Sequence, residues 1–179
     1  MPMMPAAGAA KRGKNHDRGP LTKYLAFRLA DDIYGAPLSL IREILERKPL
    51  TPVPRAHPSI MGIISNRGQL ITVIDLRRRL HLAERPETNK ARILTTNPMG
   101  IELLGLYVDE VLQTYDLADN EIEPTTTAFG GEVAGYISGI VRPASVEGPS
   151  ANRVGKRVAA AKQVARVIIL LDLKIILAT

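Results

Sequence analysis

The stretch from Gly62 to Leu76 constrains the fold of this chain more than any other part of the sequence. Two apolar runs rich in β-branched residues, 60–65 and 69–74, overlap this stretch and are separated by Asn66-Arg67-Gly68. β-Branched residues favour strands, whereas asparagine and glycine tolerate the positive φ angles of a tight turn. The pattern therefore predicts a β-hairpin in which Asn66 and Gly68 supply the positive φ angles.

Two residues of this stretch have further consequences. Asp75 closes the second strand and is placed to N-cap a short helical turn over residues 76–80. Arg67 lies at the apex of the hairpin, where a long cationic side chain is either solvated or free to contact a partner. The second alternative makes Arg67 a candidate binding residue.

Short strands separated by turn signals also fill the rest of the chain. Alternating apolar residues over 23–29 predict a half-buried strand, and residues 33–38 predict a second strand at a sheet edge, because Pro37 lacks an amide donor. A helical turn capped by Ser39 is expected to continue through Ile44. Further strands are expected over residues 91–96, 101–108, 111–115, 133–141 and 167–171, with a helical turn from Asp172.

A weak internal repeat predicts how these strands are organised. Gly62-Ile-Ile precedes a strand that ends in Asp75-Leu, and Gly139-Ile-Val precedes one that ends in Asp172-Leu. The glycine and the aspartate are 13 positions apart in the first copy and 33 in the second, which carries a basic, alanine-rich insert at 142–166. The repeat and the many short strands predict an all-β protein built from two similar small barrels.

The charge distribution divides the chain into a body and two basic segments. The formal net charge is +6, of which residues 1–22 carry +3, residues 142–166 carry +5 and the remainder −2. Residues 1–22 lack periodicity and are predicted to form a disordered basic tail before a domain at 23–179. The body is slightly acidic and aromatic residues are few, so a basic-armed barrel that binds nucleic acid is the weaker alternative.

The composition also argues against catalysis, metal binding and cofactor binding. The chain has no cysteine, its three histidines are scattered, and it lacks a glycine-rich phosphate loop. Asp75, Asp109 and Asp172 each end an apolar strand and either converge as a carboxylate cluster or cap the turns that follow. The sequence shows no signal-peptide pattern and no apolar run near the ~20 residues of a membrane span. We expect a cytoplasmic protein without enzymatic activity or membrane insertion.

An ordered set of segments carries a resemblance that runs from about Lys23 to Leu177. The segments are Tyr24–Leu29, Ile41–Leu45, Leu50–Pro54, Gly62–Gly68, Val73–Arg77, Leu104–Val111 and Leu170–Leu173. This set resembles the CheW family of chemotaxis adaptors. The resemblance implies two intertwined, five-stranded SH3-like β-barrels with short helical turns.

The resemblance also implies a function and partners. A CheW-like protein is a non-enzymatic scaffold that couples the cytoplasmic tip of methyl-accepting chemoreceptors to the regulatory domain of a CheA-type histidine kinase, and it would reach membrane receptor arrays through these partners. Similar domains serve pilus-driven twitching systems, so the motile output is left open.

Candidate partner-binding residues follow from the same resemblance. Arg67 matches the family's hairpin arginine, which is important for coupling, and Glu43 matches an acidic residue near it, so we expect an Arg67–Glu43 ion pair. Ile41 and Gly62 match further positions linked to partner binding. The alternatives are that Glu43 is an ordinary surface residue and that Gly62 marks a strand bulge.

The sequence departs from the family pattern at three places. Ser65-Asn66 stands where asparagine and then a large apolar residue are usual, Thr72 stands where proline is common, and the insert at 142–166 has no counterpart. These departures bear on the identity of the partner rather than on the fold.

Overall fold

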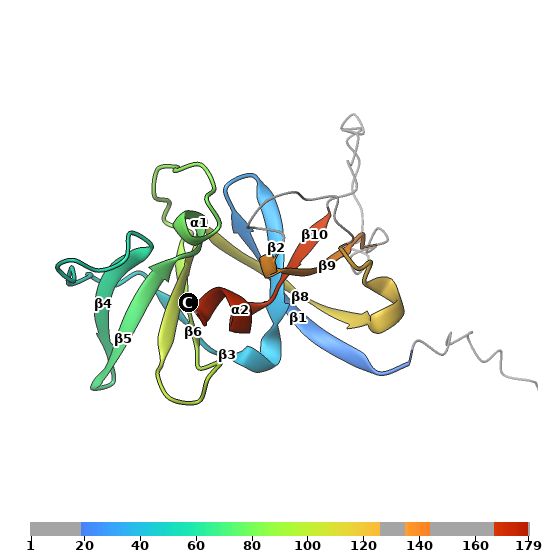
Figure 1. Cartoon of the computed structure of the whole chain (residues 1–179), viewed down its shortest axis with the longest axis horizontal. Helices are drawn as coiled ribbons and strands as arrows, with labels where there is room; N and C mark the ends of the chain where they lie inside the picture. Colours follow the sequence, from blue (N-terminus) through green and yellow to red (C-terminus); the bar gives the residue numbers. More distant parts are fainter. Residues whose placement is uncertain (1–18, 126–134, 144–166, 179) are drawn as a thin grey trace, which may run out of the picture.

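The structure is a computed structural model that describes residues 19–125, 135–143 and 167–178. Within these residues the chain is mostly β, with two five-stranded sheets and two short α-helices (Figure 1). The strand order is β8-β1-β2-β10-β9 in sheet 1 and β3-β6-β7-β5-β4 in sheet 2. The elements are β1 (Leu21–Leu29), β2 (Asp32–Pro37), β3 (Ile41–Glu46), β4 (Ile60–Asn66), β5 (Gln69–Asp75), α1 (Leu76–Arg79), β6 (Arg92–Thr96), β7 (Leu104–Val108), β8 (Glu110–Ala118), β9 (Ile137–Val141), β10 (Ile168–Leu171) and α2 (Leu173–Leu177), with 3-10 turns at Leu38–Leu40 and Asp119–Glu121.

Along the chain, the strands of sheet 2 are inserted between two parts of sheet 1. After the β1–β2 hairpin of sheet 1 the chain crosses to sheet 2, where β3 pairs with β6. After the β6–β7 hairpin of sheet 2 it crosses back, and β8 pairs with β1. Sheet 2 is therefore built from the consecutive strands β3 to β7, whereas sheet 1 combines two separate parts of the chain, β1–β2 and β8–β10. The predicted all-β class with two similar five-stranded units is confirmed.

The predicted repeat is confirmed by topology and by local contacts. β4 and β5 are antiparallel and β5 runs parallel to β7, just as β9 and β10 are antiparallel and β10 runs parallel to β2. The residue after each repeat glycine forms an isolated bridge to the segment before it, Ile63 with Thr51 and Ile140 with Glu123. The second copy differs at the β9–β10 connection, which contains the insert.

Both α-helices begin at the predicted aspartates. The Asp75 carboxylate accepts a hydrogen bond from the Arg77 amide, and the Asp172 carboxylate accepts hydrogen bonds from the amides of Lys174 and Ile175. These side chains satisfy amides that have no partner in the first turn of a helix. Each aspartate thus ends a strand and starts a helix, as the sequence indicates.

The hydrophobic core has three parts. A shared cluster lies between the sheets and includes α1 and α2, and Figure 1 shows α2 in this position. Each sheet also encloses a cluster of its own. Representative buried residues are Phe27, Leu76, Leu106 and Ile176 between the sheets, Ile71 and Ile93 in sheet 2, and Ile33 and Ile168 in sheet 1.

Two predicted elements are wrong. β2 is the central strand of sheet 1 rather than an edge, and Pro37 is tolerated because it is the last residue of β2, beyond the Ile33–Gly35 segment that pairs with β10. The helical turn expected after Ser39 is a 3-10 turn followed by strand β3. Pairing of β3 with β6 provides backbone partners that the local sequence does not reveal.

The boundaries of the basic segments lie mostly outside the described residues. β1 begins at Leu21, so the last two residues of the expected tail at 1–22 belong to a strand. Residues 1–18, and all of the insert at 142–166 except Arg142 and Pro143, lie outside the described residues. The predicted strand over 133–141 begins at Ile137, and residues 133–134 are outside the described range.

Tyr34 makes stability depend on pH in the alkaline range. Its side chain is 5% exposed within the shared core, and burial, together with the Asp32 carboxylate, raises the pKa of Tyr34 to about 12. A phenol with a higher pKa in the folded chain stabilises the fold below the unfolded pKa, and this contribution is lost as the pH rises towards 12.

We expect urea denaturation to reveal this contribution. Between about pH 9 and pH 12 the free energy of unfolding should fall by about 2–3 kcal/mol more in the wild type than in Tyr34→Phe, which cannot ionise. Equal losses in the two proteins would contradict the assignment.

Candidate functional site

The β4–β5 hairpin presents Arg67 to solvent at its tip. Asn66 pairs with Gln69, so that the loop consists only of Arg67 and Gly68, with φ angles of 51° and 79°. Positive φ at both central residues is the pattern of a type I′ hairpin turn, which favours asparagine and glycine. The expectation that Asn66 adopts positive φ is wrong, because Arg67 does so itself. Positive φ is unfavourable for a residue with a long side chain such as arginine. A residue held in an unfavourable backbone conformation is a candidate functional residue.

Arg67 and Glu43 form the expected ion pair. Arg67 Nη2 lies 3.3 Å from Glu43 Oε1, and the Arg67 side chain is 81% exposed. Glu43 lies on β3 and Arg67 follows β4, the two edge strands of sheet 2, so the contact joins the two edges. An exposed pair contributes only about 0–1 kcal/mol. The contact therefore orients Arg67 more than it stabilises the fold.

Asn66 extends the ion pair into a small network. Its Nδ2 donates to Glu43 Oε2 at 3.3 Å, and its Oδ1 accepts from Lys48 Nζ at 2.6 Å. Both carboxylate oxygens of Glu43 are thus bound. Asn66 is one of the departures from the family pattern, and here it fixes Glu43. The sequence did not identify Lys48 or this role of Asn66, since the contacts span 18 and 23 positions.

A hollow of about 450 Å³ opens beside the ion pair. Arg42 lines it at a register irregularity of β3, and Gln69, Thr95 and Leu103 complete its wall. Exposed apolar side chains lie at the same end of sheet 2: Leu70 next to the turn, and Met99 and Ile101 in the β6–β7 loop. Figure 1 shows this loop and the β4–β5 turn at the lower edge of the sheet.

Ile41 and Gly62 do not join this group. Ile41 is partly buried and packs against the shared core. Gly62 is buried in β4 with a φ of 151°, and a Cβ atom there would lie 2.5 Å from the Thr51 carbonyl oxygen. The register of β4 and β5 also shifts between Ile60 and Gly62. This close approach explains the glycine without a partner, and partner binding by Ile41 and Gly62 stays a prediction.

Asp75 and Asp109 converge, but an arginine lies between them. Arg77 Nε is 3.4 Å from Asp75 Oδ1, and Arg77 Nη1 is 3.4 Å from Asp109 Oδ1. Burial lowers the pKa of Arg77, but the charges of Asp75 and Asp109 outweigh this effect and the pKa is raised. A permanent cation between the carboxylates makes them unsuited to act as an acid–base pair. Asp172 stays at the N-cap of α2.

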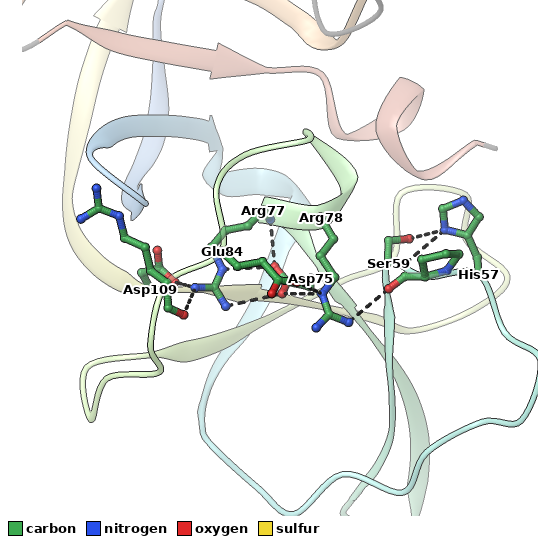
Figure 2. A network of polar contacts seen from close by, with 9 residues as sticks. His57, Ser59, Asp75, Arg77, Arg78, Glu84 and Asp109 are labelled. Carbon is green, nitrogen blue, oxygen red and sulfur yellow. Dashed lines mark hydrogen bonds and ion pairs between the residues drawn. The ribbon is translucent and has the colours of Figure 1, made fainter.

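The residues that the structure describes hold no cluster of metal-ligating side chains. His57 Nδ1 lies 2.7 Å from the Oγ of buried Ser59, which brings a histidine and a serine together. The nearby Asp75 carboxylate binds arginines rather than His57, as Figure 2 shows, so these groups do not form a catalytic triad. In the same part of the chain, no helix is long and apolar enough to cross a membrane.

Two five-stranded sheets that present an exposed, charged hairpin are features of a scaffold with a binding surface. The chain belongs to the CheW-like domain family, whose domain matches residues 23–179. It is therefore a CheW-like adaptor of chemotaxis, a non-enzymatic scaffold.

Individual relatives agree with this assignment. A chemotaxis protein CheW from Rhizobium meliloti is 29% identical over 65% of this chain and 72% of its own length. Protein FrzA from Myxococcus xanthus is 30% identical over 69% of this chain and 76% of its own length. The crystal structure of the scaffolding protein TtCheW from Thermoanaerobacter tengcongensis superimposes with a TM-score of 0.70 at 25% identity, covering 89% of this chain and 94% of that chain.

Proposed function

We propose that this protein couples the cytoplasmic tip of methyl-accepting chemoreceptors to the regulatory domain of a CheA-type histidine kinase, and that the β4–β5 hairpin makes a contact essential for coupling. The observation that carries the proposal is the strained, exposed Arg67 held by Glu43 at the hairpin tip. Membership of the CheW-like family supports the choice of partners.

The surroundings of Arg67 suit a protein partner. A guanidinium has five N–H donors, and one nitrogen of Arg67 is engaged by Glu43, so donors are left for a carboxylate or for backbone carbonyls. Leu70 and Ile101, the latter 86% exposed, add apolar area at the same end of the sheet. Arginine is one of the residue types enriched at the energetic centres of protein–protein interfaces.

Kinase autophosphorylation in receptor-containing membranes tests the proposal. Adding the wild-type protein should activate the kinase, and Arg67→Glu should reduce this activation about tenfold or more, because it places a like charge beside Glu43 and removes the donor fork. Arg67→Asn should also reduce activation, while fitting the turn without loss of stability.

Arg55→Asn is the matched control, because Arg55 is another exposed arginine with positive φ, outside the hairpin. It should activate like the wild type. Full activation by folded Arg67→Glu would exclude the hairpin contact. Failure of the wild type to activate any receptor–kinase set of its own host would exclude the coupling function.

A pilus-driven twitching system is the alternative output. The proposed contact of the β4–β5 hairpin would be the same for both outputs, so a gene deletion in the host has to distinguish them. Deleting the gene should abolish chemotactic swimming if the output is flagellar, and twitching if it is pilus-based.

A further inference from the structure

One buried arginine connects elements of both sheets. Arg77 belongs to α1, which follows β5 of sheet 2, and its side chain is only 7% exposed. Besides its contacts to Asp75 and Asp109, its Nη1 donates to the Arg85 carbonyl at 2.9 Å, and its guanidinium lies 5.8 Å from the centre of the Tyr107 ring. Figure 2 shows Arg77 between the two carboxylates.

Asp109 carries the connection into sheet 1. It is the single residue between β7 of sheet 2 and β8 of sheet 1. Its Oδ2 accepts a hydrogen bond of 2.7 Å from the Ala30 amide, and its own amide donates to the Arg28 carbonyl at 3.0 Å. Ala30 lies in the β1–β2 turn with a φ of 54°, a strained conformation for alanine. Arg77 therefore reaches the β1–β2 turn of sheet 1 through one carboxylate.

The next arginines of α1 divide between the two sheets. Arg79 Nε donates to the Ile176 carbonyl at 3.0 Å, and so contacts α2, which follows β10 of sheet 1. Arg78, by contrast, contacts Asp75, Glu84 and the Pro58 carbonyl, all in the segment between β3 and β6 of sheet 2. Arg78 thus provides an internal comparison for Arg77.

The polar contacts of Arg77 and the apolar contacts of the shared core act on the two sheets in different ways. The shared core holds the sheets together, but apolar contact is non-directional. A guanidinium bound to two carboxylates and a carbonyl has fixed geometry. A buried ion pair adds little net stability compared with an apolar substitute, although its directional contacts are suited to fixing an orientation.

We propose that Arg77 is a positioning residue, which through Asp109 fixes the orientation of sheet 1 relative to sheet 2. The inference rests on the proposed coupling function in one respect: a scaffold that holds two partners in register needs its sheets in one orientation. Loss of Arg77 then impairs coupling more than it impairs binding of either partner.

Distances between spin labels test the orientation directly. The chain has no cysteine, so cysteines introduced at Ser65 on β4 and Thr114 on β8, both exposed, accept labels at single sites. Pulsed electron paramagnetic resonance should give a distance distribution about twice as broad in Arg77→Met as in the wild type, with Arg78→Met unchanged. Asp109→Asn provides a second variant, which keeps an acceptor for the Ala30 amide and should broaden the distribution less.

The distance measurement and the coupling assay test the positioning role and the coupling function separately. Unchanged distributions in folded Arg77→Met and Asp109→Asn overturn the proposal without reference to any partner. In coupling assays, folded Arg77→Met should bind the isolated kinase domain and the isolated receptor tip within about threefold of the wild type, yet activate the kinase about fivefold less. Equal losses of binding and activation would assign Arg77 a merely structural role. Absence of activation by the wild type would instead reject the coupling function and leave the label measurement as the test of the positioning role.

Discussion

Replacing Asp109 with alanine is expected to lower the free energy of unfolding by about 3–5 kcal/mol, because removing one partner of a buried ion pair leaves the other uncompensated. Arg77 is nearly fully buried, and Asp75 alone would then face its charge. The Ala30 amide would also lose its acceptor in a turn of strained φ.

Two matched variants separate these effects in urea denaturation. Asp109→Asn keeps an acceptor for the Ala30 amide and should lose about 1–3 kcal/mol. Asp31→Ala removes an exposed carboxylate paired with Arg85, and should lose no more than about 1 kcal/mol. A loss below about 1 kcal/mol in Asp109→Ala would show that the buried contact does not hold the fold.

A Gly62→Val variant is expected to lose about 2–4 kcal/mol of stability, as is typical of overpacking combined with backbone strain. Any Cβ at this position would come within 2.5 Å of the Thr51 carbonyl oxygen, so the connector before β4 has to move. That movement breaks the paired hydrogen bonds between Thr51 and Ile63, of 2.8 and 2.9 Å.

Gly135→Val is the matched control for this substitution. Gly135 is exposed, and a Cβ there has no heavy atom within 4 Å, so stability should change by no more than about 0.5 kcal/mol. Thermal unfolding of the two variants compares them under the same conditions. Equal stability of Gly62→Val and the wild type would contradict the close approach. If Gly62→Val loses stability as expected, a coupling defect of a Gly62 variant can be explained by displacement of the segment that contains Thr51. It would then not require a lost contact between Gly62 and a partner.

The hairpin combines a weak stabilising contact with an unfavourable backbone position. The Arg67–Glu43 pair is exposed, and positive φ disfavours arginine at the turn. The side chain therefore contributes little to holding the sheet together. We therefore interpret the exposed Arg67 side chain as a guanidinium that is available to a partner. The kinase assay tests this interpretation.

The sequence alone determined the features that depend on neighbouring residues. β-Branched runs around Arg67-Gly68 specify the hairpin, the aspartates at 75 and 172 start both helices, and the spaced Gly-Ile signals reveal the repeat. Turn chemistry, capping and side-chain alternation all act over a few residues, so they can be read without knowledge of the fold. The Arg67–Glu43 contact was expected only because the chain resembles a known family.

The tertiary structure decided what depends on distant partners. Residues 41–46 form a strand rather than a helical turn because β6 pairs with them from about fifty positions away, Ile41 with Thr96. Arg77 belongs to a run of three arginines that would be solvated in an isolated helix. It is buried because the crossover from β7 to β8 brings Asp109 against it. Burial, edge or centre in a sheet, and the partners of a charge are set by long-range pairing, and a local pattern does not contain that information.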